Sequence, residues 1–221
     1  MQDVTTTRES TNIIENSSIH VGEAPIKSNI FLAVRSQTNK NCYLDLCVRC
    51  AMFSIEELHE YSSHVRSDFA NKLAELPWSE VEKNREASFY SMKNILLHII
   101  DNEDWMVNWV IQNKSEGYVR RKSEEYTSMK MLLDHLGEVE EKSNRYFTKL
   151  DAGELSRRVK FTTSAGQIFD LTVEECLLQS FTEQLYHIGE LIALLWQDNI
   201  EPPKMQWFWN NPRVQTRSSG P

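Results

Sequence analysis

Hydrophobic positions recur every three to four residues along four stretches of the chain, which is the period of one face of an α-helix. The four stretches are residues 54–76, 89–113, 123–150 and 173–196. Polar and charged residues fill the positions between them, so each stretch predicts an amphipathic helix with one buried side.

Local signals mark where two of these helices begin. Ser54 is followed three residues later by Glu57, and Thr172 is followed in the same way by Glu175. Both pairs are capping boxes, in which the two side chains satisfy backbone N–H groups that the first helical turn leaves free. Pro77 ends the first helix, because proline cannot donate the backbone hydrogen bond of a helix interior.

Four amphipathic helices with one long crossover connection predict an all-α four-helix bundle. Residues 159–170 form the connection between the last two helices and predict a short extended pair with a turn. The chain lacks a glycine-rich phosphate loop, a nucleophile elbow and a dinucleotide-binding fingerprint. Beyond Trp196, Pro202 and Pro203 prevent further helix, and we expect the aromatic residues 207–209 to fold back on the bundle.

The composition changes on either side of these helices. Residues 1–52 are rich in Thr, Ser, Asn and isolated charges without a sustained period, so we expect a disordered N-terminal extension. Met52, followed by Phe53 and Ser54, is interpreted as a plausible domain start, with translation from Met52 as a hypothesis. The bundle is expected over residues 53–210, followed by a flexible tail over residues 211–221.

The charge balance restricts the partners. A net charge of -8 argues against binding a nucleic-acid backbone, which requires clustered Lys and Arg. The cluster at residues 120–122 precedes Glu124 and Glu125 and is interpreted as a solvated helix entry. No apolar run reaches the roughly 18 residues of a membrane span, and no signal peptide is visible. We therefore expect a cytoplasmic protein that does not bind membranes.

Three cysteines near the start of the bundle form a C-x4-C-x2-C pattern, at Cys42, Cys47 and Cys50. With His59 or His64 as a fourth ligand they could hold zinc, but no second C-x2-C pair accompanies them. Free thiols are the favoured interpretation.

The fourth helix contains the strongest candidate chemistry. Glu183 and His187 are four residues apart, so both side chains project from one face of the helix and can converge on one cation. This spacing is more often a surface hydrogen bond than a metal site, so a third ligand is needed. His98 lies in the apolar sequence NILLHIIDNEDW. On the residues alone, a core histidine bonded to a backbone carbonyl is favoured over a metal ligand.

The run from about Phe53 to Trp209 resembles the DinB/YfiT-like family of metal-binding four-helix bundles. The family pattern has one histidine in the second helix and an H-x3-H pair in the fourth, followed by a motif close to His-Arg-Gly-Gln. Here LLHIIDNEDWMVNW carries His98, and EQLYHIGELIALL carries Glu183 and His187. The sequence departs from the pattern at Glu183, where the family has the first histidine of the pair.

The resemblance implies that His98, Glu183 and His187 bind one divalent metal ion. Two imidazoles and one carboxylate suit Zn, Ni, Mn or Fe, and the carboxylate favours oxygen-preferring metals more than a third imidazole would. The substitution is equally compatible with a lapsed site that binds nothing. Hydrogen bonds from an outer shell are expected from four polar residues: Asn94, Asp101, Asn102 and Gln179.

The family also implies an activity. Its members include transferases and isomerases that use low-molecular-weight thiols, and proteins assigned as metal-dependent hydrolases. We therefore expect a metal-dependent enzyme acting on a small-molecule substrate, with thiol S-transfer as the leading chemistry and hydrolysis as the alternative. Two alternatives remain: a non-catalytic metal-binding or stress-response protein, and an interaction bundle with a lapsed site that forms a homodimer through an apolar helix face. Four aromatic segments are interpreted as core, with a substrate-pocket wall as the alternative: Trp105, Trp109, Tyr186 and residues 207–209.

Overall fold

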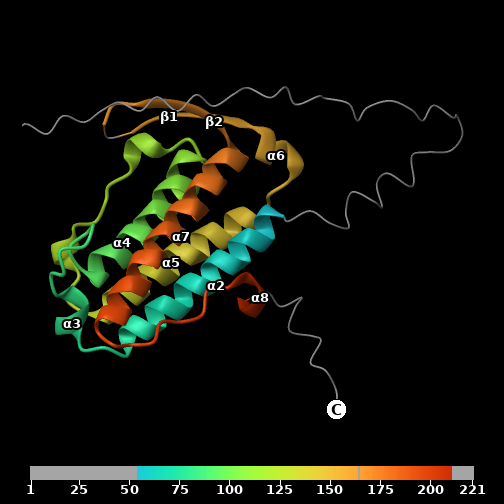
Figure 1. Ribbon diagram of the computed structural model, residues 1–221. Coiled ribbons are helices and arrows are strands. Elements are labelled where there is room, and N and C mark those ends of the chain that lie inside the picture. Colours follow the sequence, from blue (N-terminus) through green and yellow to red (C-terminus); the bar gives the residue numbers. More distant parts are fainter. Residues whose placement is uncertain (1–53, 164, 211–221) are drawn as a thin grey trace, which may run out of the picture. The chain divides into compact units, whose positions relative to one another are not determined.

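The computed structural model describes residues 54–163 and 165–210, in which four long helices form a bundle (Figure 1). These helices are α2 (Ile55–Ala74), α4 (Met92–Glu103), α5 (Met129–Phe147) and α7 (Val173–Gln197). The predicted all-α bundle is confirmed. The predictions for residues 1–52, for the Cys42, Cys47 and Cys50 cluster and for residues 211–221 lie outside the described residues.

Shorter elements connect the long helices. They are α3 (Trp78–Glu82), the π-helix η1 (Asp104–Val110), the 3-10 helices η2 (Ser115–Gly117) and η3 (Ser123–Glu125), α6 (Ala152–Ser156), the strands β1 (Arg158–Thr162) and β2 (Ile168–Thr172), and α8 (Trp207–Asn210). None of the helices in the described residues is long and apolar enough to span a lipid bilayer.

Helices α2 and α7 run in one direction, and α4 and α5 run in the other (Figure 1). Helix α7 packs against both α2 and α4, and α5 packs against the same two helices. Because α4 and α5 are parallel, residues 111–128 carry the chain back along the bundle. The predicted extended pair is an antiparallel hairpin at one end, with Arg158 opposite Thr172 and Thr162 opposite Ile168.

Side-chain caps set the starts of three long helices. Both predicted capping boxes are present, at Ser54 with Glu57 and at Thr172 with Glu175. Helix α4 begins after Ser91, whose hydroxyl accepts a hydrogen bond from the backbone N–H of Asn94 at 3.2 Å. These caps matter for the site, because α4 and α7 carry its candidate ligands.

The second predicted helix, residues 89–113, is not one regular α-helix. Regular α-helix ends at Glu103, and Asp104–Val110 forms a π-helix with wider backbone hydrogen bonding. A π-helix has i→i+5 hydrogen bonds, so each turn holds one more residue than a turn of α-helix. The spacing of the side chains that face the core therefore changes within η1, and Met106, Val107 and Val110 are still buried. The apolar pattern therefore continues across a change of helix type.

The third predicted helix begins later than expected. Helix α5 starts at Met129 and not at Ser123, because Ser128 has extended backbone angles and the chain before it makes only a single 3-10 turn. The aromatic segment after α7 does return to the bundle. Trp207 packs on Tyr61 of α2 with ring centroids 4.8 Å apart.

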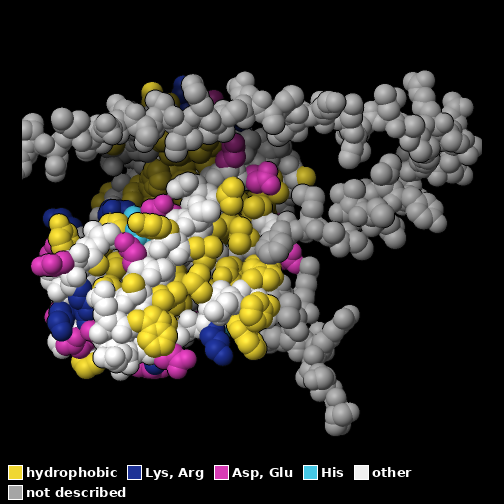
Figure 2. Space-filling view, viewed as in Figure 1, with side chains coloured by type: hydrophobic (Ala, Val, Ile, Leu, Met, Phe, Trp, Pro, Cys, Tyr) yellow, Lys and Arg dark blue, Asp and Glu magenta, His cyan; other side chains and the backbone are white. Residues whose placement is uncertain are grey.

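The interior is built from apolar side chains of all four long helices. Several hydrophobic side chains nevertheless remain exposed along α7, including Leu178, Tyr186 and Trp196. Figure 2 shows hydrophobic side chains at the surface on this face of the molecule.

A buried arginine joins the four long helices. Arg66 of α2 is fully buried and donates hydrogen bonds to Glu103 of α4, to Gln184 of α7 at 2.9 Å and to Glu140 of α5 at 3.0 Å. Burial alone would raise the pKa of Glu103, but the neighbouring Arg66 guanidinium holds that pKa below its usual value. Gln184 also donates to the backbone carbonyl of Ser62 at 2.7 Å.

We expect Arg66→Met to lower the free energy of unfolding by about 3–5 kcal/mol, because Glu103 would remain buried without its counter-charge. Urea unfolding followed by circular dichroism measures this change. The control is Lys130→Met, which removes an exposed ion pair with Asp134 and should cost less than about 1 kcal/mol. Similar small losses in both variants would contradict the stabilising role of the buried network.

His135 of α5 is a second buried polar residue, with its Nδ1 2.6 Å from the hydroxyl of Tyr126. Burial, with a smaller contribution from the positive charge of Arg121, lowers the pKa of His135 from 6.5 to about 4. Between these two values the unfolded chain binds a proton that the folded chain does not. Protonation therefore favours the unfolded chain, so the free energy of unfolding is highest above about pH 6.5 and falls as the pH drops towards 4.

Replacing His135 by Gln should reduce the loss of unfolding free energy between pH 7 and pH 4 by about 3 kcal/mol. Glutamine can still bond the Tyr126 hydroxyl but does not titrate. Urea unfolding across this pH range measures the effect, with His64→Gln at an exposed histidine as the control. An unchanged pH profile in His135→Gln would show that another group causes the acid sensitivity.

Candidate metal centre

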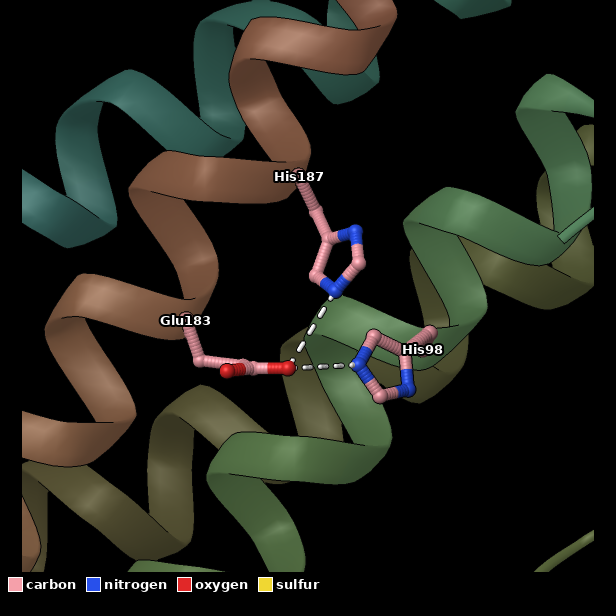
Figure 3. A group of neighbouring side chains, drawn as sticks. All are labelled: His98, Glu183 and His187. Carbon is pink, nitrogen blue, oxygen red and sulfur yellow. Dashed lines mark hydrogen bonds and ion pairs between the residues drawn. The ribbon is translucent and has the colours of Figure 1, made fainter. Parts of the chain in front are cut away.

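Three potential ligands converge between α4 and α7. The i, i+4 spacing places Glu183 and His187 on the same side of α7, and α4 packs against this side and contributes His98. The Glu183 carboxylate points between the two imidazole rings (Figure 3). The structure thus brings together the three residues that the sequence analysis selected.

The distances suit a common ion. Oε1 of Glu183 lies 3.3 Å from Nε2 of His187 and 3.5 Å from Nε2 of His98. One ligand atom from each of the three residues lies within 4.8 Å of the other two. Ligand atoms of tetrahedral zinc, at about 2.0–2.1 Å from the ion, are about 3.3–3.4 Å apart. Each imidazole is therefore spaced from the Glu183 carboxylate like a neighbouring ligand of one metal.

His98 has the environment of a ligand more than that of a core histidine. Both of its ring nitrogens are buried and make no hydrogen bond within the described residues. Its ring stacks on Phe89, with centroids 4.2 Å apart. Burial, followed by the nearby charge of His187, lowers the pKa of His98, so the ring is neutral at pH 7 and keeps a lone pair available. The expected bond to a backbone carbonyl is absent.

Glu190 orients His187, and sequence reasoning did not identify this role. Its Oε2 lies 2.6 Å from Nδ1 of His187 and also accepts a hydrogen bond from the Ser88 hydroxyl at 2.8 Å. A carboxylate on one imidazole nitrogen fixes the ring orientation and leaves the other nitrogen for a metal. The available signal was the i, i+3 spacing of His187 and Glu190 on the predicted fourth helix.

The four residues expected in the outer shell have different positions. Gln179 donates to Glu183 at 3.3 Å. Asn94 instead bonds the carbonyl of Phe89 and the hydroxyl of Ser123, and Asn102 lies 3.4 Å from the carbonyl of Ser180. The fourth residue, Asp101, lines a pocket next to His98.

This pocket has a volume of about 190 Å³, and His98 forms part of its wall. Asp101 and Arg120 form an ion pair in it at 3.2 Å, and Arg121 contributes a second guanidinium. Burial raises the pKa of Asp101 to about 6, although Arg120 opposes the shift. A carboxyl group with this pKa can exchange a proton near neutral pH. The lining residues are Phe89, Tyr90, Asn94, Leu97, His98, Asp101, Arg120, Arg121 and Ser123.

The aromatic residues considered for the pocket wall lie in different places, and none of them lines the pocket beside His98. Trp105 packs on Phe161, with ring centroids 5.5 Å apart. Tyr186 is exposed and contacts the edge of His187 at 4.9 Å between centroids. The side chains of His98 and Glu183 are 17% and 35% exposed, so a small molecule can reach the cluster from solvent.

The fold and the cluster together define a four-helix bundle whose facing helices present two histidines and a glutamate at one point. No protein-family model and no curated protein sequence matches the chain. Its structure is similar to the crystal structure of a DinB-like protein from Bacillus cereus, with a TM-score of 0.51 and 14% sequence identity. The match covers 68% of this chain and 94% of that one. The fold is therefore DinB-like, as the sequence resemblance predicted.

Proposed function

We propose that the protein binds one divalent metal ion through His98, Glu183 and His187 and acts as a metal-dependent thiol S-transferase. The observation that carries the metal site is the environment of His98. Both ring nitrogens are buried without a hydrogen bond among the described residues, which is costly in a folded protein, and a metal on Nε2 would remove part of that cost. The same Nε2 faces Glu183.

Three protein ligands leave coordination positions for other molecules, as in catalytic metal sites. A divalent ion bound there would act as a Lewis acid and lower the pKa of a thiol or water molecule that binds to it. The choice of a low-molecular-weight thiol rests on the resemblance to DinB-like transferases. The metal site itself rests on the geometry of the three side chains.

The chain's own residues have separate tasks in this proposal. Glu190 holds the His187 ring, and Glu183 offsets one positive charge of the ion. The pocket beside His98 receives the substrate, and Asp101 exchanges a proton there. In the transfer, the thiol sulfur forms a bond to an electrophilic carbon, the leaving group departs with its electron pair, and the thiol proton passes to Asp101 and from there to solvent.

Metal content per chain, measured by elemental mass spectrometry on protein without an affinity tag, tests the site. We expect about one equivalent in the wild type and loss of metal in Glu183→Ala and in His187→Ala, with the helical circular dichroism retained. His64→Ala, at an exposed histidine, is the control and should keep the metal. No metal in the wild type after incubation with Zn, Ni or Mn would favour an interaction bundle with a lapsed site.

The transferase activity needs its own test. The metal-loaded protein should accelerate the loss of free thiol in a mixture of a low-molecular-weight thiol and an electrophilic acceptor, and His187→Ala should abolish the acceleration. If the protein binds metal but accelerates the reaction of none of several thiols, the alternative of a non-catalytic metal-binding protein would be favoured.

Removing the Glu190 carboxylate tests its orienting role. Glu190→Ala should weaken metal binding by about 10- to 100-fold, because the His187 ring would lose the partner that fixes it. Competition with a chelator of known affinity measures the change. Glu174→Ala removes an exposed charge from the first turn of the same helix and should leave the affinity unchanged. Equal affinities in both variants would contradict the role of Glu190.

A further inference from the structure

A second and larger pocket lies between η1 and α5, with a volume of about 510 Å³. None of the described residues that line it belongs to the metal cluster or to the pocket beside His98. Asn108, which lines this pocket, comes ten residues after His98, a separation of roughly 15 Å along a helix axis. The two sites are therefore separate.

The charge of this pocket is opposite to that of the chain. Four cationic side chains line it, and none of its lining residues is acidic: the cations are Lys114, Lys142, Arg145 and Lys149. The whole chain carries a net charge of -8. A local concentration of positive charge on an acidic protein attracts small anions against the general field.

Two of these cations already have a carboxylate neighbour and two do not. Lys142 lies 3.8 Å from Asp104, and Arg145 bonds Glu141. Among the described residues, no carboxylate lies within ion-pair distance of Lys114 or Lys149. Their charges therefore remain available to a ligand.

The rest of the lining suits a flat ring with polar edges. Trp109 and Tyr146 contribute partly buried aromatic surface, and Asn108 contributes a side-chain amide. The amide of Gln112 is already used, because it donates to the carbonyl of Val107 and accepts from Lys114. Asn108 is 7% exposed, and its Oδ1 accepts no hydrogen bond within the described part of the chain. A buried amide with an unused acceptor is unusual and can be satisfied by a donor on a ligand.

The backbone at this pocket is also unusual. Asn108 and Trp109 belong to the π-helix η1, and π-helical turns occur frequently at functional sites. The change of helix type begins at Asp104, directly before the pocket. It sets which side chains of this segment face α5.

We propose that this pocket binds a small phosphate ester that carries a flat ring, the chemistry of a nucleoside monophosphate. The lysines and Arg145 bind the phosphate, Trp109 and Tyr146 pack against the ring, and the Asn108 amide bonds its edge. The pocket volume lies within the range of small-molecule sites.

Isothermal titration calorimetry of the full chain with adenosine 5′-monophosphate tests the proposal. We expect saturable binding that weakens at higher salt, and at least tenfold weaker binding of adenosine, which lacks the phosphate. Ribose 5-phosphate, which lacks the base, should also bind at least tenfold more weakly. The Lys149→Gln variant should weaken nucleotide binding by about fivefold or more. Lys130→Gln, at an exposed lysine near the start of α5, is the control.

A second variant tests whether the nucleotide binds at the metal centre and not in this pocket. His187→Ala should bind adenosine 5′-monophosphate as tightly as the wild type, because the pocket does not contain His187. Loss of binding in this variant would place the nucleotide on the metal centre and overturn the proposal. It would equally be overturned by no binding at millimolar concentration, by equal losses in Lys149→Gln and Lys130→Gln, or by equal affinities for the nucleotide and ribose 5-phosphate.

Discussion

The position of every long helix depends on one buried charge. Arg66 reaches side chains of the three other long helices from the interior of the bundle, so its hydrogen bonds restrict how each helix can slide or rotate. Isolated apolar contacts tolerate small shifts along a helix, whereas a buried guanidinium leaves unpaired charges when its partners move. Gln184, one of those partners, directly follows the candidate ligand Glu183 in the sequence. The network therefore fixes the part of α7 that faces His98.

The polar groups that stabilise the bundle lie apart from those that could bind a metal. The buried ion pair of Arg66 and Glu103 lies at the centre, away from water. The candidate metal ligands lie nearer the surface, and their polar atoms point towards one another with few other partners. A carboxylate and two imidazoles in such a place attract a cation without contributing to the hydrophobic core. The packing of the bundle consequently depends little on which polar side chain stands at position 183, since Glu183 is 35% exposed.

Periodicity and capping boxes were sufficient to predict the four helices, because both reflect local rules of helix formation. The three candidate ligands followed from the spacing of Glu183 and His187 and from a family resemblance that added His98. Arg66 could not be predicted as buried, since a single charged residue beside an apolar stripe looks the same as a surface residue. Glu190 was missed because an i, i+3 pair on a helix is common, and its partner Ser88 lies far away in the sequence.

The π-helix has a consequence for insertions and deletions. A π-turn corresponds to one additional residue in an α-helix, and each residue of an α-helix turns the chain by about 100°. Removing one residue from η1 would restore regular helix without moving His98, which lies before it. Because the loss of the π-turn absorbs the deletion, side chains after η1 would keep their facing, and only those within η1, such as Trp109, would change position. Related chains that differ in length by one residue here would keep the candidate metal centre and change only the part of the second pocket that η1 forms.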